Sequence, residues 1–258
     1  MPSNEDWKLL ISASETDGVQ TKVVGDYEIS YFVAKDPDKD KDNEDSLFIS
    51  YSAGQLLMGV CDGAGGHPRG ADASKIVCET FVKQHHKNKE HFDLAQVIEE
   101  ANQNVIDLKA GAKSTMILAW VTDGKFRSAS VGDSEVVYWN SQAREIYSNI
   151  PHSVVGYKIE AGILDQEKAL DEDDRYAVDH LMGDEFIRIE MSSGMALKKG
   201  HCLVLGSDGI FDNFSHNQLS SIFSEGKLTE FAELCKSQPK DNWKKRDDVA
   251  FIFLKKLQ

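Results

Sequence analysis

Apolar and polar positions alternate with a period of two in parts of the chain, which predicts β-strands there. The alternation is clear over residues 27–33, and residues 56–61 are apolar throughout, as expected for a strand buried on both faces. Residues 114–140 are expected to form a meander with turns at Asp123-Gly124 and Gly132-Asp133-Ser134. The predicted strands cover residues 27–33, 47–51, 56–61, 114–122, 125–131, 135–140, 186–191, 202–206 and 249–254.

Apolar positions recur at three- and four-residue spacing elsewhere, which predicts helices. Ala73, Ile76, Val77 and Phe81 mark the first of them. Blocks of strands separated by helix pairs favour an α+β layered fold with mainly antiparallel sheets, in a single domain over residues 1–258. The predicted helices cover residues 70–85, 92–108, 217–223 and 229–236.

Two segments carry weak periodicity. Residues 1–25 are expected to form a lead-in segment, with an edge strand at residues 7–12 as the alternative. Residues 149–184 are acidic, and we expect them to form a surface flap with a short helix near residues 176–181.

The composition narrows the class of protein. The formal charge of −14, from 43 acidic and 29 basic residues, argues against nucleic acid as a partner. No apolar run is long enough to cross a bilayer, and the first 25 residues lack a signal-peptide pattern, so a cytoplasmic protein without membrane contact is expected. The cysteines form no C-x-x-C pair, which argues against zinc and favours reduced thiols; they are Cys61, Cys78, Cys202 and Cys235.

Aspartates follow or precede several apolar runs at the point where the chain turns. Asp62, Asp133 and Asp208 come at strand ends, and Asp247 stands just before the last strand. Carboxylates placed in this way can converge above a sheet as hard oxygen ligands for Mg²⁺ or Mn²⁺. A single Asp-Gly pair is usually an ordinary turn, so the argument depends on the recurrence of the pattern.

The acidic segment from Asp36 to Asp45 resembles a calcium loop only superficially. Lys41 stands where such a loop needs glycine, and Leu47 stands where it needs the bidentate glutamate. Residues 36–42 are therefore expected to form a solvated loop, while Asp45 lies at the start of the next strand.

Nucleotide-hydrolase and serine-hydrolase motifs are incomplete. Gly65 and Gly70 have the spacing of a phosphate-binding loop, but Ala71-Asp72 follow where Lys and Ser or Thr are required. The segment Gly206-Ser207-Asp208-Gly209 is one residue too short for a nucleophile elbow. The best candidate motifs for nucleotide hydrolysis and for serine-hydrolase catalysis are therefore excluded.

Five short motifs, in order, resemble the signatures of the metal-dependent protein phosphatase family, type 2C, and of its small bacterial members. Each motif alone is weak, but their order over residues 43 to 250 is specific. They are Asn43-Glu44-Asp45-Ser46, Val60-Cys61-Asp62-Gly63-Ala64-Gly65-Gly66-His67, Gly132-Asp133-Ser134, Ser207-Asp208-Gly209-Ile210-Phe211-Asp212 and Arg246-Asp247-Asp248-Val249.

The resemblance implies a four-layer αββα sandwich with a binuclear Mn²⁺ or Mg²⁺ site at one end. Asp62 would bridge both metals, and the Gly63 carbonyl would bind one of them. Asp208 and Asp247 would complete the shell of the second metal, with Asp45 close by as a ligand or holding a metal-bound water.

The family also implies the reaction. Asp133 would belong to a third, weaker metal site. The substrates would be phosphoserine and phosphothreonine proteins, and we expect the chain to act as a monomer. Cations would neutralise the phosphate and lower the pKa of a bridging water, which would attack phosphorus in line with the leaving oxygen.

Several positions depart from the family pattern. Ala64 stands where many members have a histidine that is a candidate general acid, so a metal-bound water or His67 would have to serve. Asp40 stands where the phosphate-binding arginine is usual, and Lys39 or Lys41 would replace it with a non-bidentate contact.

Other features leave alternatives open. Arg69 is a further candidate for phosphate binding, and Pro151-His152-Ser153 departs from the usual Asp-His-Ser. Asp171-Glu172-Asp173-Asp174 in the flap would select basic phosphopeptides or form a solvated loop. The departures also motivate a second hypothesis, a catalytically inactive phosphatase-like binding or regulatory module.

Overall fold

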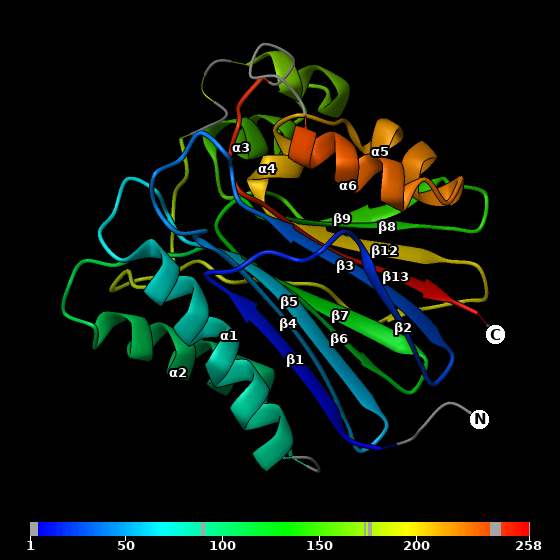
Figure 1. Cartoon of the computed structure of the whole chain (residues 1–258), viewed down its shortest axis with the longest axis horizontal. Coiled ribbons are helices and arrows are strands. Elements are labelled where there is room, and N and C mark those ends of the chain that lie inside the picture. Colours follow the sequence, from blue (N-terminus) through cyan, green and yellow to red (C-terminus); the bar gives the residue numbers. More distant parts are fainter. Residues whose placement is uncertain (1–4, 89–90, 173, 175–176, 238–243, 258) are drawn as a thin grey trace.

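The computed structural model describes residues 5–88, 91–172, 174, 177–237 and 244–257. Two antiparallel sheets face each other, and helices cover both outer faces, giving the four layers αββα (Figure 1). The predicted fold class is therefore confirmed.

The first sheet has the strand order β1-β4-β5-β6-β7-β10, with β11 also paired to β7. Every pairing in it is antiparallel. Its strands are β1 (Trp7–Ser12), β4 (Asp45–Ser52), β5 (Gln55–Asp62), β6 (Met116–Thr122), β7 (Lys125–Val131), β10 (Glu190–Met191) and β11 (Met195–Ala196).

The second sheet has the order β2-β3-β13-β12-β8-β9 and is also antiparallel. Its central strand β13 comes from the C-terminal part of the chain and lies between β3 and β12, as the red ribbon shows in Figure 1. Its strands are β2 (Gln20–Val24), β3 (Tyr27–Ala34), β8 (Glu135–Trp139), β9 (Glu145–Ser148), β12 (Cys202–Gly206) and β13 (Val249–Lys256).

Helices cover the outer face of each sheet. They bury the apolar side chains that point away from the core between the sheets. The first sheet packs on α1 (Gly70–Lys87) and α2 (Leu94–Ile106). The second sheet packs on α4 (Asp208–Phe211), α5 (His216–Ser224) and α6 (Leu228–Ser237). The flap, residues 149–184, contains α3 (Val154–Glu160) and the 3₁₀ helix η1 (Gln166–Asp171).

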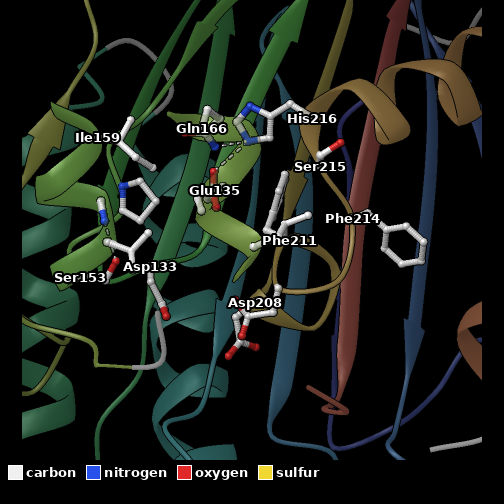
Figure 2. Close-up of a pocket in the computed structure, with 16 residues that line it drawn as sticks. Asp133, Glu135, Ser153, Ile159, Gln166, Asp208, Phe211, Phe214, Ser215 and His216 are labelled. Atoms are coloured by element: carbon white, nitrogen blue, oxygen red, sulfur yellow. Dashed lines mark hydrogen bonds and ion pairs between the residues drawn. The ribbon is translucent and has the colours of Figure 1, made fainter. Parts of the chain in front are cut away.

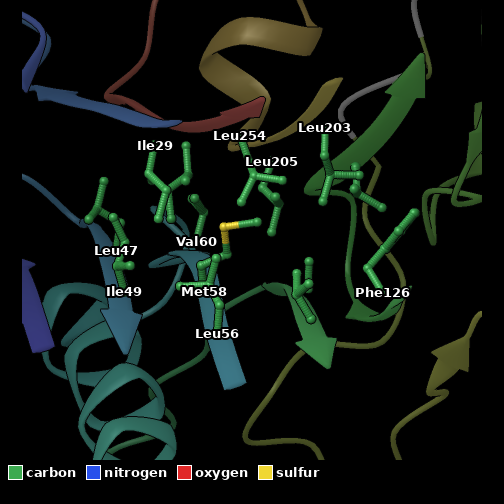
Figure 3. Packing of buried hydrophobic residues seen from close by; sticks show 14 of the residues in the cluster. Ile29, Leu47, Ile49, Leu56, Met58, Val60, Phe126, Leu203, Leu205 and Leu254 are labelled. Atoms are coloured by element: carbon green, nitrogen blue, oxygen red, sulfur yellow. The ribbon is translucent and has the colours of Figure 1, made fainter. Parts of the chain in front are cut away.

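The core between the sheets is built from the inward-facing side chains of both. Figure 3 shows Met58 and Val60 of the first sheet opposite Leu205 and Leu254 of the second. Each of these four side chains is fully buried, which stabilises the fold by about 1.5–3 kcal/mol per large aliphatic side chain. This dry layer fixes the separation of the two sheets.

Several sequence predictions are wrong or incomplete. Within residues 1–25, the edge strand offered for residues 7–12 is confirmed as β1 at one edge of the first sheet, while β2 at one edge of the second was not predicted. Of the strand predicted over residues 186–191, only Glu190–Met191 is a strand. The meander is broken at Gly132, because β8 joins the second sheet while β6 and β7 remain in the first.

The flap differs from its prediction as well. Residues 177–181 form no helix, with an isolated β-bridge between Val178 and Ser153 and a left-handed backbone at His180, so the helix predicted near residues 176–181 is absent from these residues; Tyr176 lies outside the described residues. The flap helices occur earlier, at α3 and η1, and Ser153 caps α3 by accepting a hydrogen bond from the Gly156 N–H.

Two further findings bear on the class of protein. Within the described part of the chain, no helix combines the length and the apolar character that crossing a bilayer requires. All four cysteines are free thiols, and Cys61, Cys78 and Cys235 are buried.

Candidate metal centre

An acidic pocket of about 430 Å³ opens at one end of the two sheets. Four aspartates that the sequence singled out line it: Asp62, Asp133, Asp208 and Asp247. They come from the ends of strands in both sheets, because β5, β7 and β12 end here and β13 begins here. The predicted convergence of these carboxylates therefore occurs in the structure.

The first sheet contributes Asp45 and Asp62, which face each other across the β4–β5 pair. Asp45 is buried, and its Oδ2 accepts a hydrogen bond of 2.6 Å from Ser207 Oγ of the second sheet. Ser207 Oγ in turn accepts a bond from the Ala250 N–H at 3.0 Å. Ser207 thus joins the two sheets directly behind the pocket.

The second sheet contributes Asp208 and Asp247. Asp208 is buried, and among the described residues its Oδ1 has no hydrogen-bond partner. A buried, unsatisfied carboxylate oxygen is costly unless a cation or a donor reaches it. This oxygen fits a metal ligand.

Asp133 sits in the turn between β7 and β8, where the chain crosses from one sheet to the other. Gly132 has φ +93, and an added Cβ would lie 2.9 Å from Thr115 Cβ, so the turn requires glycine. The His152 N–H donates to the Gly132 carbonyl at 2.9 Å, and His152 Nδ1 accepts from the Gly132 N–H at 3.2 Å. His152 therefore ties the base of the flap to the turn that carries Asp133.

The carboxylates repel one another strongly. Burial, followed by the charges of Asp208 and Asp45, raises the pKa of Asp62 well above its usual value. Burial and the charge of Asp248 likewise raise the pKa of Asp45, and burial with Asp208 raises that of Asp133. Such a concentration of negative charge is stabilised by cations, and hard carboxylate oxygens suit Mg²⁺ and Mn²⁺.

Two lysine ammonium groups lie among these carboxylates. Lys245 forms ion pairs with Asp208 and with Asp247, the latter at 3.3 Å. Lys39 forms ion pairs with Asp247 and, at 3.2 Å, with Asp248. Among the described residues no three acidic, histidine or cysteine side chains are grouped closely enough to hold a metal ion, and ammonium groups pair with Asp208 and Asp247.

The basic candidates for phosphate binding are placed differently. Lys39 and Lys245 line the acidic pocket. Lys41 is exposed and is not among the lining residues, so the geometry favours Lys39 of the two predicted lysines. Arg69 is exposed and pairs with Asp72 at 2.7 Å. His67 is exposed at the pocket wall beside Ala64.

Most residues of the loop 36–42 are exposed, as expected for a solvated loop, but its first residue is anchored to the body of the protein. Asp36 is buried and forms an ion pair of 3.1 Å with Arg246. Asp248 accepts bonds from the Asp36 N–H at 2.8 Å and from the Glu44 N–H at 2.9 Å. These contacts bring Lys39 into the pocket, and neither Asp248 nor Arg246 was assigned a role from the sequence.

The flap acids are partly engaged in ion pairs within the chain. Asp171 pairs with Lys244, and Glu172 pairs with Lys158 at 2.7 Å. Asp174 lies 3.9 Å from Lys158, while Asp173 falls outside the described residues.

A second pocket adjoins the acidic one, and Asp133 and Asp208 line both (Figure 2). Within it, His216 Nε2 lies 3.0 Å from Glu135 Oε2, and His216 Nδ1 lies 2.9 Å from Glu145 Oε2. Burial alone would lower the pKa of His216, but hydrogen bonds and charge attraction from the two glutamates outweigh it and raise the pKa to about 10. Sequence periodicity carries no signal for this ion-pair triad, because its members come from three separate elements.

The tight backbone at Gly63 gives a testable prediction. A Cβ at Gly63 would lie 2.3 Å from the Gly70 carbonyl carbon, whereas a Cβ at Gly66 would meet nothing within 4 Å. We expect Gly63→Ala to lower the free energy of unfolding by about 1–3 kcal/mol through overpacking, measured by urea denaturation. Gly66→Ala is the matched control in the same loop, and equal stability of the two variants would contradict the prediction.

The αββα sandwich places aspartates from both sheets around one acidic pocket, an arrangement suited to a hydrolase that uses divalent cations. A family model described as protein phosphatase 2C matches residues 37–243. The chain therefore belongs to the protein phosphatase 2C family of metal-dependent protein serine/threonine phosphatases.

Solved structures share the fold. The serine/threonine phosphatase Stp1 from Staphylococcus aureus is 24% identical, with a TM-score of 0.72 over 88% of this chain and 94% of that one. The catalytic domain of the phosphatase PstP in complex with two manganese ions is 18% identical, with a TM-score of 0.67 over 90% and 99%. RsbX in complex with magnesium is 16% identical, with a TM-score of 0.60 over 92% and 98%. A search of curated proteins by sequence gave no match.

Proposed function

We propose that the acidic pocket hydrolyses phosphoserine and phosphothreonine monoesters of proteins with two Mn²⁺ or Mg²⁺ ions as cofactors. The observation that carries this proposal is the set of four motif aspartates from both sheets lining one pocket. The metals named for the similar phosphatase PstP and for RsbX support the choice of cofactor.

In this proposal each side chain has a separate task. Asp62 at the end of β5 lines the pocket and would hold both cations, with the Gly63 carbonyl beside it. Asp208 and Asp247 would hold the second cation, and Asp133 a weaker third one. Asp45, fixed by Ser207, would orient a water molecule.

The cations, when bound, neutralise the phosphate and make water a nucleophile near neutral pH. Lys39, at the pocket wall, would bind a phosphoryl oxygen as a point charge. His67, exposed at the same wall, would donate the proton to the departing serine or threonine oxygen.

Finer assignments belong to the same proposal. We place the protein in the cytoplasm, on the support of the free thiols in the described chain, and we propose that it acts as a monomer with a single domain. Selection of basic phosphopeptides by the flap has weaker support, because three of its acids already contact lysines of the chain.

Metal removal tests the proposal. Hydrolysis of p-nitrophenyl phosphate and of a phosphothreonine peptide by the whole chain is expected to fall by roughly 10²-fold or more after chelation, and to return with Mn²⁺ or Mg²⁺, because the cations supply several kcal/mol of transition-state stabilisation. Turnover that persists without metal would contradict the mechanism. Phosphopeptide binding without turnover at saturating metal would instead favour an inactive binding module.

A further inference from the structure

The ammonium group of Lys245 lies among three carboxylates of the acidic pocket. It pairs directly with Asp208 Oδ2, and it lies 3.3 Å from Asp247 Oδ2 and 3.5 Å from Asp212 Oδ2. The side chain is 30% exposed, so water screens these contacts only in part. Lys245 is the group in the structure that neutralises Asp208.

The same two carboxylates, Asp208 and Asp247, are those assigned to the second cation, although Asp208 meets Lys245 with Oδ2 and leaves Oδ1 unpartnered among the described residues. Mg²⁺ binds carboxylate oxygens at about 2.0–2.1 Å, while Lys245 already forms ion pairs with one oxygen of Asp208 and one of Asp247. An ammonium and a metal ion on the same pair of carboxylates would repel each other as like charges, because their separation would be only a few ångströms. The two cannot neutralise this pair of aspartates at once.

The backbone of Lys245 is held independently of its side chain. The Lys245 N–H donates to Asn213 Oδ1 at 3.2 Å, and its carbonyl accepts from Asn213 Nδ2 at 2.7 Å. Asn213 Nδ2 also donates to the Gly209 carbonyl at 2.9 Å, one residue beyond Asp208. The lysine side chain can therefore leave the carboxylates without moving the segment that carries Asp247.

We propose that Lys245 is an internal competitor for the cation held by Asp208 and Asp247. Its ammonium neutralises these carboxylates in the metal-free chain and is displaced when the cation binds. The competition weakens this one cation position and leaves the position formed by Asp62 and Gly63 less affected. The inference rests on the proposed metal site.

Isothermal titration of metal-stripped protein with Mn²⁺ tests the competition. Lys245→Gln is expected to bind the weaker Mn²⁺ roughly tenfold more tightly than the unmodified chain, because one opposing charge is removed at close range. Lys244→Gln is the matched control, because Lys244 contacts Leu170 and Asp171 of the flap instead of the pocket aspartates. Its Mn²⁺ affinity is expected to equal that of the unmodified chain.

Thermal unfolding gives a second readout that is independent of activity. Without metal, Lys245→Gln is expected to melt at a lower temperature than Lys244→Gln, because Asp208 loses its ion pair with Lys245 while Asp247 keeps only its pair with Lys39. Mn²⁺ is expected to raise its melting temperature by more than it raises that of the control. Lys245→Met, which keeps much of the aliphatic stem, provides the same test if the glutamine variant folds poorly.

The possible results distinguish a failure of the Lys245 competition from a failure of the proposed metal site on which it rests. Equal or weaker Mn²⁺ binding by the Lys245 variants, with normal binding by the unmodified chain, would overturn the competition and leave the metal site standing. Absence of Mn²⁺ binding in the unmodified chain and in every variant would overturn the proposed metal site, and the competition with it.

Discussion

Replacing Asp208 by alanine is expected to lower kcat/KM for p-nitrophenyl phosphate by roughly 10³-fold, because losing a metal ligand removes several kcal/mol of transition-state stabilisation. Asp208 is the pocket carboxylate with a buried oxygen that lacks a partner among the described residues, so no other protein group compensates for its loss. The loss is expected at saturating substrate as well, because it affects the chemical step more than substrate binding.

The measurement compares steady-state kinetics at saturating Mn²⁺ with circular dichroism of the same samples. Asp72→Ala is the control, because Asp72 lies on α1 outside the pocket and makes an exposed pair with Arg69. That variant is expected to keep the activity of the unmodified chain. A folded Asp208→Ala variant with nearly full activity would exclude Asp208 from the metal shell.

His216→Ala is expected to lower the free energy of unfolding by about 3–5 kcal/mol, the range for removing one partner of a buried ion pair. The substitution leaves the buried Glu135 carboxylate without its partner, and it removes the connection from α5 to β8 and β9. Urea denaturation at neutral pH measures the loss. His91→Ala is the control, because His91 is exposed, and little change is expected there.

We also expect the stability difference between the unmodified chain and His216→Ala to depend on pH. Because Glu135 and Glu145 raise the pKa of His216 to about 10 in the folded chain, its stabilising contribution is complete below the unfolded pKa of about 6.5. The contribution then declines as the pH rises and is lost above about pH 10. The difference in unfolding free energy between the unmodified chain and His216→Ala should therefore shrink from pH 6.5 toward pH 10. A difference that stays constant over this range would show that the imidazole is not held in its charged form.

Periodicity predicted most strands because each buries one or both faces against a neighbouring layer. Residues 56–61 and 249–254 were read as buried strands, and both lie in the interior of their sheets. The same signal could not assign β8 to the second sheet, because alternation reports burial and carries no information on the partner strand. The short β2 was missed because its first residues are exposed and break the alternation.

The convergence of the four motif aspartates could be predicted from the sequence, because each of them stands at the end or just before the start of an apolar run. Asp62, Asp133, Asp208 and Asp247 line one pocket, as the motif order indicated. Lys245 was not recognised, because the sequence shows a basic triplet without indicating which side chain turns inward. The hydrogen bonds from Asp248 to the loop that carries Lys39 were equally hidden, because they join residues about two hundred positions apart.

The hydrogen bond from Ser207 to Asp45 spans the two sheets at the level of the acidic pocket. Charge placed there acts across the interface between the layers, so any repulsion among the aspartates that Lys39 and Lys245 do not offset opposes the packing of β4 and β5 against β12 and β13. A cation bound between the aspartates would attract both sheets. Cation binding and the packing of the two sheets at this end would then be thermodynamically linked, so that each stabilises the other. The concentration of divalent metal in the surroundings would consequently set how firmly this end of the sandwich stays closed.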